Sequence, residues 1–600
     1  MSDVYKKTVL SQFAFLKRTT RLDDLLAKSI GLPDEQGYLI PVCEFHIDDR
    51  DIIADLAKWR EENALAFPTQ FTVSLDGTAN WLKNKVLAVP DRMLFLVADR
   101  HGRPIGHIGL ANAANENREV ELDNIVRGIK DTSLGIMTVA VKTLLAWLQE
   151  FLMPNHVFLR VFEGNQHAID FYQNLGFKRS TTIPLRRHVS GDFIHYEPLE
   201  EEDHEKPDKE FLLMVYEAPI TEDIPEVIQT AGPSISARET SYVLNAVQNG
   251  WGLHWRDYIS QFEQAFAEYL GTKYALSTSS CTGALHLALL ALDIGPGDEV
   301  IVPDSTWVAT AAAVTYVGAT PVFADVERES WCLDPTSFES LISDKTRAVI
   351  PVHLYGHPAR MDKITQIAKK HGLDVIEDAA PAIGAEFAGQ KTGTFGRFAA
   401  FSFQGAKLMV TGEGGMLVTN DTELFNKAQL LWDQGRDPNR TFWINQIGWK
   451  YKMSNIQAAL GLAQLERVDE LIAAKRRLFT WYEEGLRDIP HITLMHEQTW
   501  AKSIYWMSSI VLKESAGISR DELRKKLLER NIDTRPVFPA ISQYPIWPKS
   551  QPAQPVAKWI GDHAINLPSK GGLTAAQVQY VCENIKDILT NRNQEKLEAI

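Results

Sequence analysis

A lysine, an aspartate, a tryptophan and a Ser-Cys-Thr triplet in the second half of the sequence have the side chains needed for carbonyl chemistry. Lys407 supplies an amine that can form an imine once it has lost its proton. Asp378 ends an apolar run, and Trp307 follows the segment VIVPDST. The triplet 280–282 opens a helix-like segment that can hold a phosphate. An imine-forming lysine, a carboxylate for a pyridine nitrogen, an aromatic plate and a phosphate cup predict bound pyridoxal phosphate.

The first part of the sequence carries a different set of reactive groups. Tyr172 has a phenol that is neutral at pH 7 and can protonate a leaving group. Glu119, Glu121 and Asp123 alternate along a predicted strand and so fall on one face, and we choose Glu121 among them as a general base. A solvated strand face remains the alternative for these carboxylates. A glycine-bearing loop around Gly135 precedes a helix and could bind an anion through free N–H groups.

The predicted strands and helices that must position Lys407, Asp378 and Trp307 alternate regularly along the chain. From residue 232 onward short apolar strands alternate with helices: YALST precedes CTGALHLALLAL, and EVIVP precedes TWVATAAAVTYV. This order predicts an α/β domain with a mostly parallel sheet covered by helices on both faces. Ligands of such sheets bind at the carboxyl ends of the strands, where the residues above are expected to meet.

The reactive residues of the first part, among them Tyr172 and Glu121, belong to a region where predicted strands and helices are mixed. Strands are predicted at 93–98, 105–111, 118–126 and 156–162, with a helix between the last two. Acidic, proline-bearing stretches mark the end of this part. We therefore divide the chain as follows: an N-terminal extension at 1–36, a first domain at 37–217, a linker at 218–231 and a second domain at 232–600.

Composition limits the function classes. Lys and Arg number 62 against 77 Asp and Glu, a net charge of −15, which argues against general binding to nucleic acid or anionic membranes. The four cysteines form neither a disulfide framework nor a metal-ligand cluster, so we expect no metal and a reducing compartment. Without a membrane-length apolar run or a signal peptide, the chain is expected to be cytoplasmic.

The motifs of the second domain resemble those of nucleotide-sugar aminotransferases of the DegT/DnrJ type, above all the perosamine-synthase-like branch. The matching segments are SSCTGALHLAL, GPGDEVIVPDSTWVATA, YGHPARMDKI, VIEDAAPAIGA, FSFQGAKLMVTGEGGMLVTND and YKMSNIQAALGLAQLERVDEL. The resemblance implies fold type I of the pyridoxal phosphate enzymes, with a smaller C-terminal α/β subdomain.

The same resemblance implies residue roles. Lys407 would be the Schiff-base lysine and proton shuttle, Asp378 would bind the pyridinium nitrogen, and Trp307 would stack on the ring. The phosphate would be held by residues near the strand ends, namely Ser280, Cys281, Thr282 and Ser402. Asn455, inside a capping-box pattern that opens a helix, would reach the phosphate of the partner subunit, which implies a homodimer. A helix-start residue without that contact is the alternative for Asn455.

Two departures from the family pattern concern the cofactor. Cys281 stands where the family has a glycine in its phosphate turn. Pro381 stands where a Gln or Glu commonly touches the phenolic oxygen of the cofactor. Because Lys407 and Asp378 remain, transamination is expected to survive. Some relatives have histidine in place of this lysine and are dehydratases, so Lys407 argues against that activity.

The first domain resembles the GNAT superfamily of acetyl-CoA-dependent N-acetyltransferases. The resemblance lies in the strand HVFLRVF followed by EGNQHAIDFYQNLGF, and in the preceding glycine loop, which has one glycine where two are common. It implies that two parallel strands splay apart around the pantetheine arm and that Tyr172 protonates the CoA thiolate. The cofactor-binding residues would be Ser133, Gly135, Ile136, Met137 and Asn165.

Together the two resemblances predict a bifunctional enzyme. The second domain would aminate a nucleotide-linked keto-deoxysugar, with L-glutamate as donor, and the first would N-acetylate the resulting amino sugar with acetyl-CoA for polysaccharide or glycan assembly. Three alternatives stay open: the first domain acylates another amine, the first domain is a non-catalytic binding module, or the second domain is a cyclitol aminotransferase.

Overall fold

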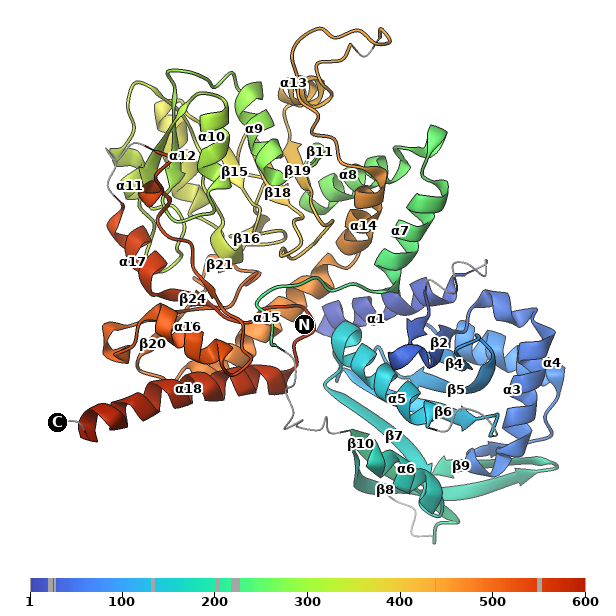
Figure 1. Cartoon of the computed structure of the whole chain (residues 1–600). Helices are drawn as coiled ribbons and strands as arrows, with labels where there is room; N and C mark the ends of the chain where they lie inside the picture. Colours follow the sequence, from blue (N-terminus) through green and yellow to red (C-terminus); the bar gives the residue numbers. More distant parts are fainter. Residues whose placement is uncertain are drawn as a thin grey trace. The chain divides into compact units, whose positions relative to one another are not determined.

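The computed structural model describes residues 2–19, 25, 28–130, 135–199, 206–216, 227–437, 439–547 and 553–598. The chain forms two compact units, Met1–Glu222 with Ser236–Ser241, and Asp223–Ile235 with Tyr242–Ile600. Each unit has its own sheet and its own core (Figure 1). Among the described residues, no helix is both long enough and apolar enough to cross a membrane.

The smaller unit is built on one ten-stranded sheet. In sheet order its strands are β1 (Ile30–Gly31), β2 (Gly37–Pro41), β4 (Met93–Asp99), β5 (Pro104–Ala111), β6 (Glu119–Arg127), β7 (His156–Phe162), β10 (Lys209–Tyr216), β8 (Phe177–Ser190), β9 (Phe193–Pro198) and β3 (Thr69–Gln70). All neighbours are antiparallel except β6 and β7, which are parallel. The predicted strands of this unit are therefore present, and the sheet is mixed, as expected.

Helices cover the two faces of this sheet with separate cores. One core joins α1 (Ser2–Lys17), α5 (Ile136–Trp147) and α6 (Gln166–Asn174) to the strands, and the other joins α3 (Arg50–Glu62) and the segment after α4 (Leu75–Trp81). β6 changes the face that it presents to these cores: Val120 and Leu122 belong to the first, whereas Val126 belongs to the second, because the register of β6 with β5 shifts between His107 and Gly109. The side chains of Glu121 and Asp123 accordingly lie on the face opposite to that of Leu122.

The larger unit contains a seven-stranded sheet. In sheet order its strands are β11 (Tyr274–Thr278), β19 (Gly415–Thr419), β18 (Phe398–Ser402), β15 (Asp374–Asp378), β14 (Thr346–Val349), β12 (Glu299–Pro303) and β13 (Thr320–Ala324). β19 runs in the direction opposite to that of the other strands in this sheet, which are parallel to one another. The prediction of a mostly parallel sheet is confirmed.

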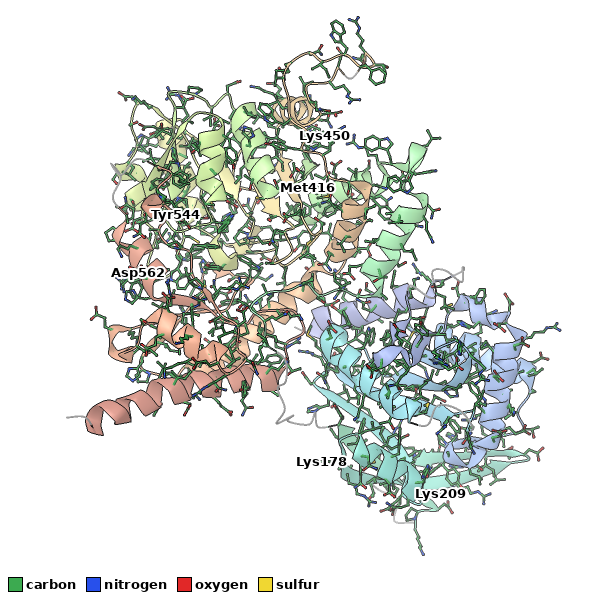
Figure 2. The ribbon with its side chains drawn as sticks, in the orientation of Figure 1. Lys178, Lys209, Met416, Lys450, Tyr544 and Asp562 are labelled. Carbon is green, nitrogen blue, oxygen red and sulfur yellow. The ribbon has the colours of Figure 1, made fainter. Side chains whose placement is uncertain are left out.

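This sheet is buried on both faces. On β12, Ile301 packs into one core cluster while Val300 and Val302 pack into the other. The helices are α7 (Ala237–Asn249), α8 (Asp257–Leu270), α9 (Cys281–Ala291), α10 (Ala309–Tyr316), α11 (Pro335–Ser340), α12 (Met361–His371), α13 (Thr422–Trp432), α14 (Asn455–Leu465) and α15 (Val468–Leu486). Side chains fill the space between the layers, with the fully buried Met416 of β19 among them (Figure 2).

A smaller α/β subdomain completes this unit at its C-terminal end, as predicted. Its four-stranded sheet has the order β20 (Ile492–Leu494), β22 (Ser509–Leu512), β24 (Ala564–Asn566) and β23 (Arg535–Pro536). The helices α16 (Arg520–Leu528), α17 (Pro555–His563) and α18 (Ala575–Glu598) belong to the same part of the chain (Figure 1). A third, three-stranded sheet consists of β17 (Gln390–Lys391), β16 (Glu386–Phe387) and β21 (Ala501–Lys502).

Two predicted boundaries differ from the structure. The predicted extension 1–36 includes α1, whose Tyr5, Val9 and Phe13 are buried in the core of the smaller unit because they recur at helical spacing. Of the predicted linker 218–231, residues 218–226 lie outside the described part. The rest of that linker is not a free connector, since the buried Ile228 exchanges backbone hydrogen bonds with Asn531 and Asp533.

Candidate active sites

The lysine and aspartate of the larger unit lie at the carboxyl ends of neighbouring parallel strands. Asp378 is the last residue of β15, and Ser402 is the last residue of β18. Lys407 follows in a turn in which its N–H donates to the carbonyl of Gln404 at 2.8 Å. The edge of the sheet predicted to bind the ligand thus carries these side chains.

Burial controls the charge of Lys407. It lowers the pKa of the amine to about 8, while the negative charge of Asp378 opposes that shift. The ammonium nitrogen lies 3.8 Å from the ring centroid of Trp506, and the indole N–H of Trp506 donates to the carbonyl of Ala406 at 2.8 Å. Trp506 is a site residue that the sequence did not reveal, because it lies about a hundred residues further along the chain. A lysine with a pKa near 8 is readily deprotonated to the nucleophilic form.

Asp378 is a buried carboxylate held by two donors. Thr310 donates its hydroxyl to Oδ2 at 2.8 Å, and the N–H of Ala380 donates to Oδ1 at 3.2 Å. Burial raises the pKa of Asp378, and these donors together with the charges of Lys407 and His353 oppose the rise. Thr310 was not predicted, although its place in the same TWVATA segment as Trp307 was a usable signal.

The predicted phosphate cup lies at the start of α9, directly after β11. Ser280 is the N-cap residue, and its hydroxyl oxygen accepts from the N–H of Gly283 at 3.0 Å. Cys281 and Thr282 occupy the first turn, where backbone N–H groups lack helical partners. Burial raises the pKa of the Cys281 thiol well above its usual value, so it stays protonated. Gly415 of β19 packs so closely here that a methyl group on it would lie 2.6 Å from the Cys281 nitrogen.

Trp307 presents an accessible aromatic surface beside these groups. Its side chain is 57% exposed, and its ring centroid lies 5.6 Å from that of Phe538. Phe538 stacks on Tyr355, and Tyr355 stacks on Trp506. The row of rings therefore joins Trp307 to the indole that lies against Lys407.

Asn455 lies at the start of α14, whose capping box between Ser454 and Gln457 is present as predicted. The side chain of Asn455 is buried and bonded within its own chain. Its oxygen accepts from the N–H of Tyr258 at 3.0 Å, and its amide donates to the carbonyls of Gly250 and His254 at 3.3 and 3.4 Å. The contact with a partner subunit's phosphate stays a prediction.

These groups fit pyridoxal phosphate. The amine of Lys407 and the carboxylate of Asp378 interact electrostatically, free N–H groups begin α9 at the same edge of the sheet, and an exposed indole lies beside them. When bound, this cofactor supplies an electron-withdrawing ring that stabilises negative charge on the carbon that bears the amino group. Thr310 and Ala380 hold the carboxylate that would face the ring nitrogen.

The smaller unit contains the splayed strands that the sequence analysis anticipates. The parallel pairing of β6 and β7 ends at Glu121 and Phe158, although β6 continues to Arg127 and β7 to Phe162. Beyond that point β6 is irregular: its register with β5 shifts between His107 and Gly109, and Asn124 has a positive φ of 47°. Beyond Glu121 and Phe158 the two strands are no longer paired with each other.

The glycine loop lies partly outside the described residues, which exclude Ser133. Gly135 is the N-cap of α5 and adopts the left-handed region, at φ 85°, which glycine tolerates without strain. Ile136 and Met137 form the first turn of α5 with buried side chains. Their N–H groups lie at the positive end of the helix dipole, as an anion site requires.

Asn165 and Tyr172 lie on α6, after β7. Asn165 is the N-cap residue, and its side-chain oxygen accepts from the N–H of Ala168 at 3.2 Å. Tyr172 packs edge-on against Phe171 and Phe177, and its hydroxyl donates to none of the described residues. Burial raises the pKa of Tyr172 to about 12, which keeps the phenol protonated and able to donate.

Glu121, the predicted base, is engaged by other side chains. Both of its oxygens accept from Arg160, at 2.7 and 3.0 Å, and Asn112 donates to Oε2 at 3.0 Å. Its exposed fraction is 5%. The structure brings Glu121 to the point where β6 and β7 separate and fixes its carboxylate there.

Comparison with known proteins assigns both units. Residues 233–586 match the model of the DegT/DnrJ/EryC1/StrS aminotransferase family. The chain belongs to this family. Residues 56–177 match the model of the Acetyltransferase (GNAT) family, so the DegT-family aminotransferase carries a GNAT domain. Membership in the first family implies pyridoxal phosphate, and the second match implies acetyl-CoA.

Relatives of this aminotransferase cover its second part. The GDP-perosamine synthase of Caulobacter vibrioides is 43% identical over 61% of this chain and 99% of its own length. The GDP-perosamine synthase of Escherichia coli O157:H7 is 41% identical over 60% of this chain and 98% of its own length. Among solved structures, Helicobacter pylori PseC, an aminotransferase involved in the biosynthesis of pseudoaminic acid, is 27% identical with a TM-score of 0.58, covering 61% of this chain and all of that one.

Proposed function

We propose that this chain is a bifunctional nucleotide-sugar enzyme that aminates a keto-deoxysugar and then N-acetylates the product. The observation that carries the proposal is the union, in one chain, of a site for pyridoxal phosphate at the strand ends of the larger unit and a splayed GNAT sheet in the smaller one. An aminotransferase makes a primary amine, and an N-acetyltransferase consumes one.

The substrate of the first step is a nucleotide-linked keto-deoxysugar, with L-glutamate as the amino donor. The naming of two relatives above 40% identity as GDP-perosamine synthases supports this class. In this proposal Lys407 carries protons at the reacting carbon, Asp378 pairs with the ring nitrogen, and Trp307 covers one face of the ring. The phosphate binds to the residues Ser280, Cys281, Thr282 and Ser402.

The second step takes place in the smaller unit. Acetyl-CoA lies between the diverging parts of β6 and β7, and the first turn of α5, from Gly135 to Met137, receives its pyrophosphate. Tyr172 gives its proton to the leaving sulfur. Ser133 and Asn165 remain predicted contacts to the cofactor, and Glu121 is the base predicted from sequence.

We further propose that the protein acts as a homodimer through the larger unit. Two segments of this unit expose large apolar side chains: Trp251, Leu253, Trp255, Phe442, Trp443, Ile444 and Ile447. A single subunit gains nothing from presenting such side chains to water, and burial against a second copy would remove them from it.

The first test combines absorbance with mass spectrometry. The purified protein should show an absorbance band of bound pyridoxal phosphate that L-glutamate bleaches and that one nucleotide keto sugar restores. Added acetyl-CoA should then increase the product mass by one acetyl group. The absence of a cofactor band after loading with pyridoxal phosphate would overturn the aminotransferase step.

The division of labour is tested with Lys407→Ala. This variant should make no amino sugar from keto sugar yet should still acetylate a supplied amino sugar, because Lys407 belongs to the larger unit alone. Loss of both activities would contradict the assignment of one step to each unit.

A further inference from the structure

Asp123 differs from the other strand carboxylates in the way its two oxygens are used. Oδ2 accepts from the guanidinium of Arg92 and from the amide of Asn124, the latter at 2.8 Å. Oδ1 is buried and has no hydrogen-bond partner among the residues that the structure describes. A buried carboxylate oxygen without a donor is costly, and a donor supplied by a bound molecule removes that cost.

The position of Asp123 suits a ligand at the acetyl-transfer point. It follows Glu121, the last residue of β6 paired with β7, and it lies on the same face of the sheet as Glu121, opposite the core that holds Leu122. Across the sheet it faces Gly109 of β5, where a methyl group would lie 2.0 Å from Oδ1. The unpartnered oxygen therefore lies over Gly109 of the neighbouring strand, in space that a side chain at that position would fill.

We propose that Asp123 is the proton acceptor of the N-acetyl transfer and that Glu121, fixed by Arg160, is a positioning residue that tunes it. This inference rests on the proposed acetylation of an amino sugar and gives Asp123 the role predicted for Glu121. Both oxygens of Glu121 already accept from Arg160, whereas Asp123 has one oxygen anchored and the other without a donor among the described residues.

The proton balance of the step is complete. The acceptor ammonium gives one proton to Oδ1 of Asp123, and the resulting amine forms a C–N bond to the thioester carbonyl carbon. The C–S bond then breaks, and the sulfur leaves with the proton of Tyr172. The nitrogen of the new amide loses a second proton, which restores Tyr172 through solvent, and Asp123 releases its proton to solvent.

The charges around Asp123 set its titration. Burial raises the pKa of Asp123 to about 6, the charge of Arg92 opposes this, and the charge of Glu121 adds to it. Arg160 of β7 faces Glu121, and His107 of β5, which binds the carbonyl of Asn124 at 2.6 Å, stays neutral because burial lowers its pKa to about 4. The carboxylate is therefore ionised above about pH 6, and kcat/KM should rise with pH through that value.

The test uses the full chain with acetyl-CoA and chemically prepared GDP-, UDP- and dTDP-linked 4-amino-4,6-dideoxysugars. Asp123→Asn keeps the shape and the acceptor for Arg92, so acetyl-CoA should bind as in the wild type, while kcat falls about 100-fold or more and the acid limb near pH 6 disappears. Glu121→Gln should keep most of the activity. The rise of kcat/KM with pH should shift to lower pH, because the negative charge of Glu121 no longer raises the pKa of Asp123. Glu119→Gln, on the same strand, is the matched control and should change neither kcat nor the pH dependence of kcat/KM.

The outcomes separate the two proposals. If the wild type acetylates one of these sugars but Asp123→Asn matches it in rate and pH profile, the assignment to Asp123 is overturned. If Glu121→Gln, rather than Asp123→Asn, abolishes turnover, Glu121 is the base. If the wild type binds acetyl-CoA but acetylates none of the sugars, the proposed function fails, and the role of Asp123 fails with it.

Discussion

At the scale of single residues, burial decides which charges the candidate sites can use. Lys407 and Asp378 are both buried, and the removal of water pushes each toward its neutral form, while each opposes that shift in the other. Without Asp378 the amine would be still less basic, and without Thr310 the carboxylate would lack one of its two donors. The reactivity of the lysine is thus a property of its surroundings.

The lowered pKa of Lys407 predicts a pH dependence. The group is an ammonium below about pH 8 and a free amine above it, so the rate at which the cofactor-free protein reacts with added pyridoxal phosphate should rise with pH and level off above about 8. An ordinary lysine would keep gaining rate toward pH 10.4. The rate is followed by the absorbance of the bound cofactor; a climb that continues past pH 9.5 would contradict the effect of burial.

Thr310 predicts a second residue effect. Thr310→Val preserves the shape but removes the hydroxyl donor to Asp378, and a hydrogen bond to a charged group contributes about 1.5–3 kcal/mol. The dissociation constant for pyridoxal phosphate should therefore rise by about tenfold or more. Titration of the cofactor-free protein measures it. Thr365→Val, on α12 away from the carboxylate, should leave binding unchanged.

At the scale of elements, α1 and the paired strands β6 and β7 define the smaller unit. The first helix buries one apolar stripe in the core that α5 shares, so it is part of the fold. The separation of β6 from β7 occurs where β6 loses its regular register with β5. This irregular pairing beside a parallel pair marks the place where we propose that acetyl-CoA binds.

The packing of α1 predicts a stability effect. Phe13 is fully buried, so Phe13→Ala should lower the free energy of unfolding of the smaller unit by about 3–5 kcal/mol. Urea unfolding monitored by loss of acetyl-CoA binding measures this. Lys6→Ala, on an exposed position of the same helix, serves as the control. Equal midpoints for the two variants would show that α1 does not support the domain.

At the scale of the whole molecule, two units with separate cores match two different enzyme families. In the described part of the chain, each core cluster holds residues of one central sheet or of neither. The exposed apolar side chains of segments 251–255 and 442–447 belong to the larger unit. Self-association is therefore expected to depend on the aminotransferase unit and to matter for amination.

The dimer proposal predicts the behaviour of a double variant. Leu253→Asp combined with Phe442→Asp places charges on side chains that are 96% and 89% exposed in the single chain, so folding should persist while association is lost. Analytical ultracentrifugation should find a dimer for the wild type and a monomer for the variant, with amination lost and acetylation kept. Leu65→Asp, at an exposed position of the smaller unit, is the control. A variant that stays dimeric would place the interface elsewhere.

The sequence by itself determined the order of the elements and the reactive residues of the larger unit. Apolar periodicity is a local property, so alternating strands and helices predicted the parallel sheet, and the strand ends predicted the place of Asp378 and Ser402. The capping box at Ser454 was equally readable, because it joins residues within one helical turn.

Only the tertiary structure decided which distant groups meet. Trp506 lies against Lys407, Thr310 binds Asp378, and α1 enters the core of a unit whose first predicted strand begins after it. Glu121 and Asp123 share one strand face and one local pattern, yet Arg160 of β7 binds the first, while Oδ1 of the second finds no partner in the described part of the chain. The physical reason is that charge partners and burial depend on neighbouring strands and helices, and local sequence does not specify which of these will lie alongside.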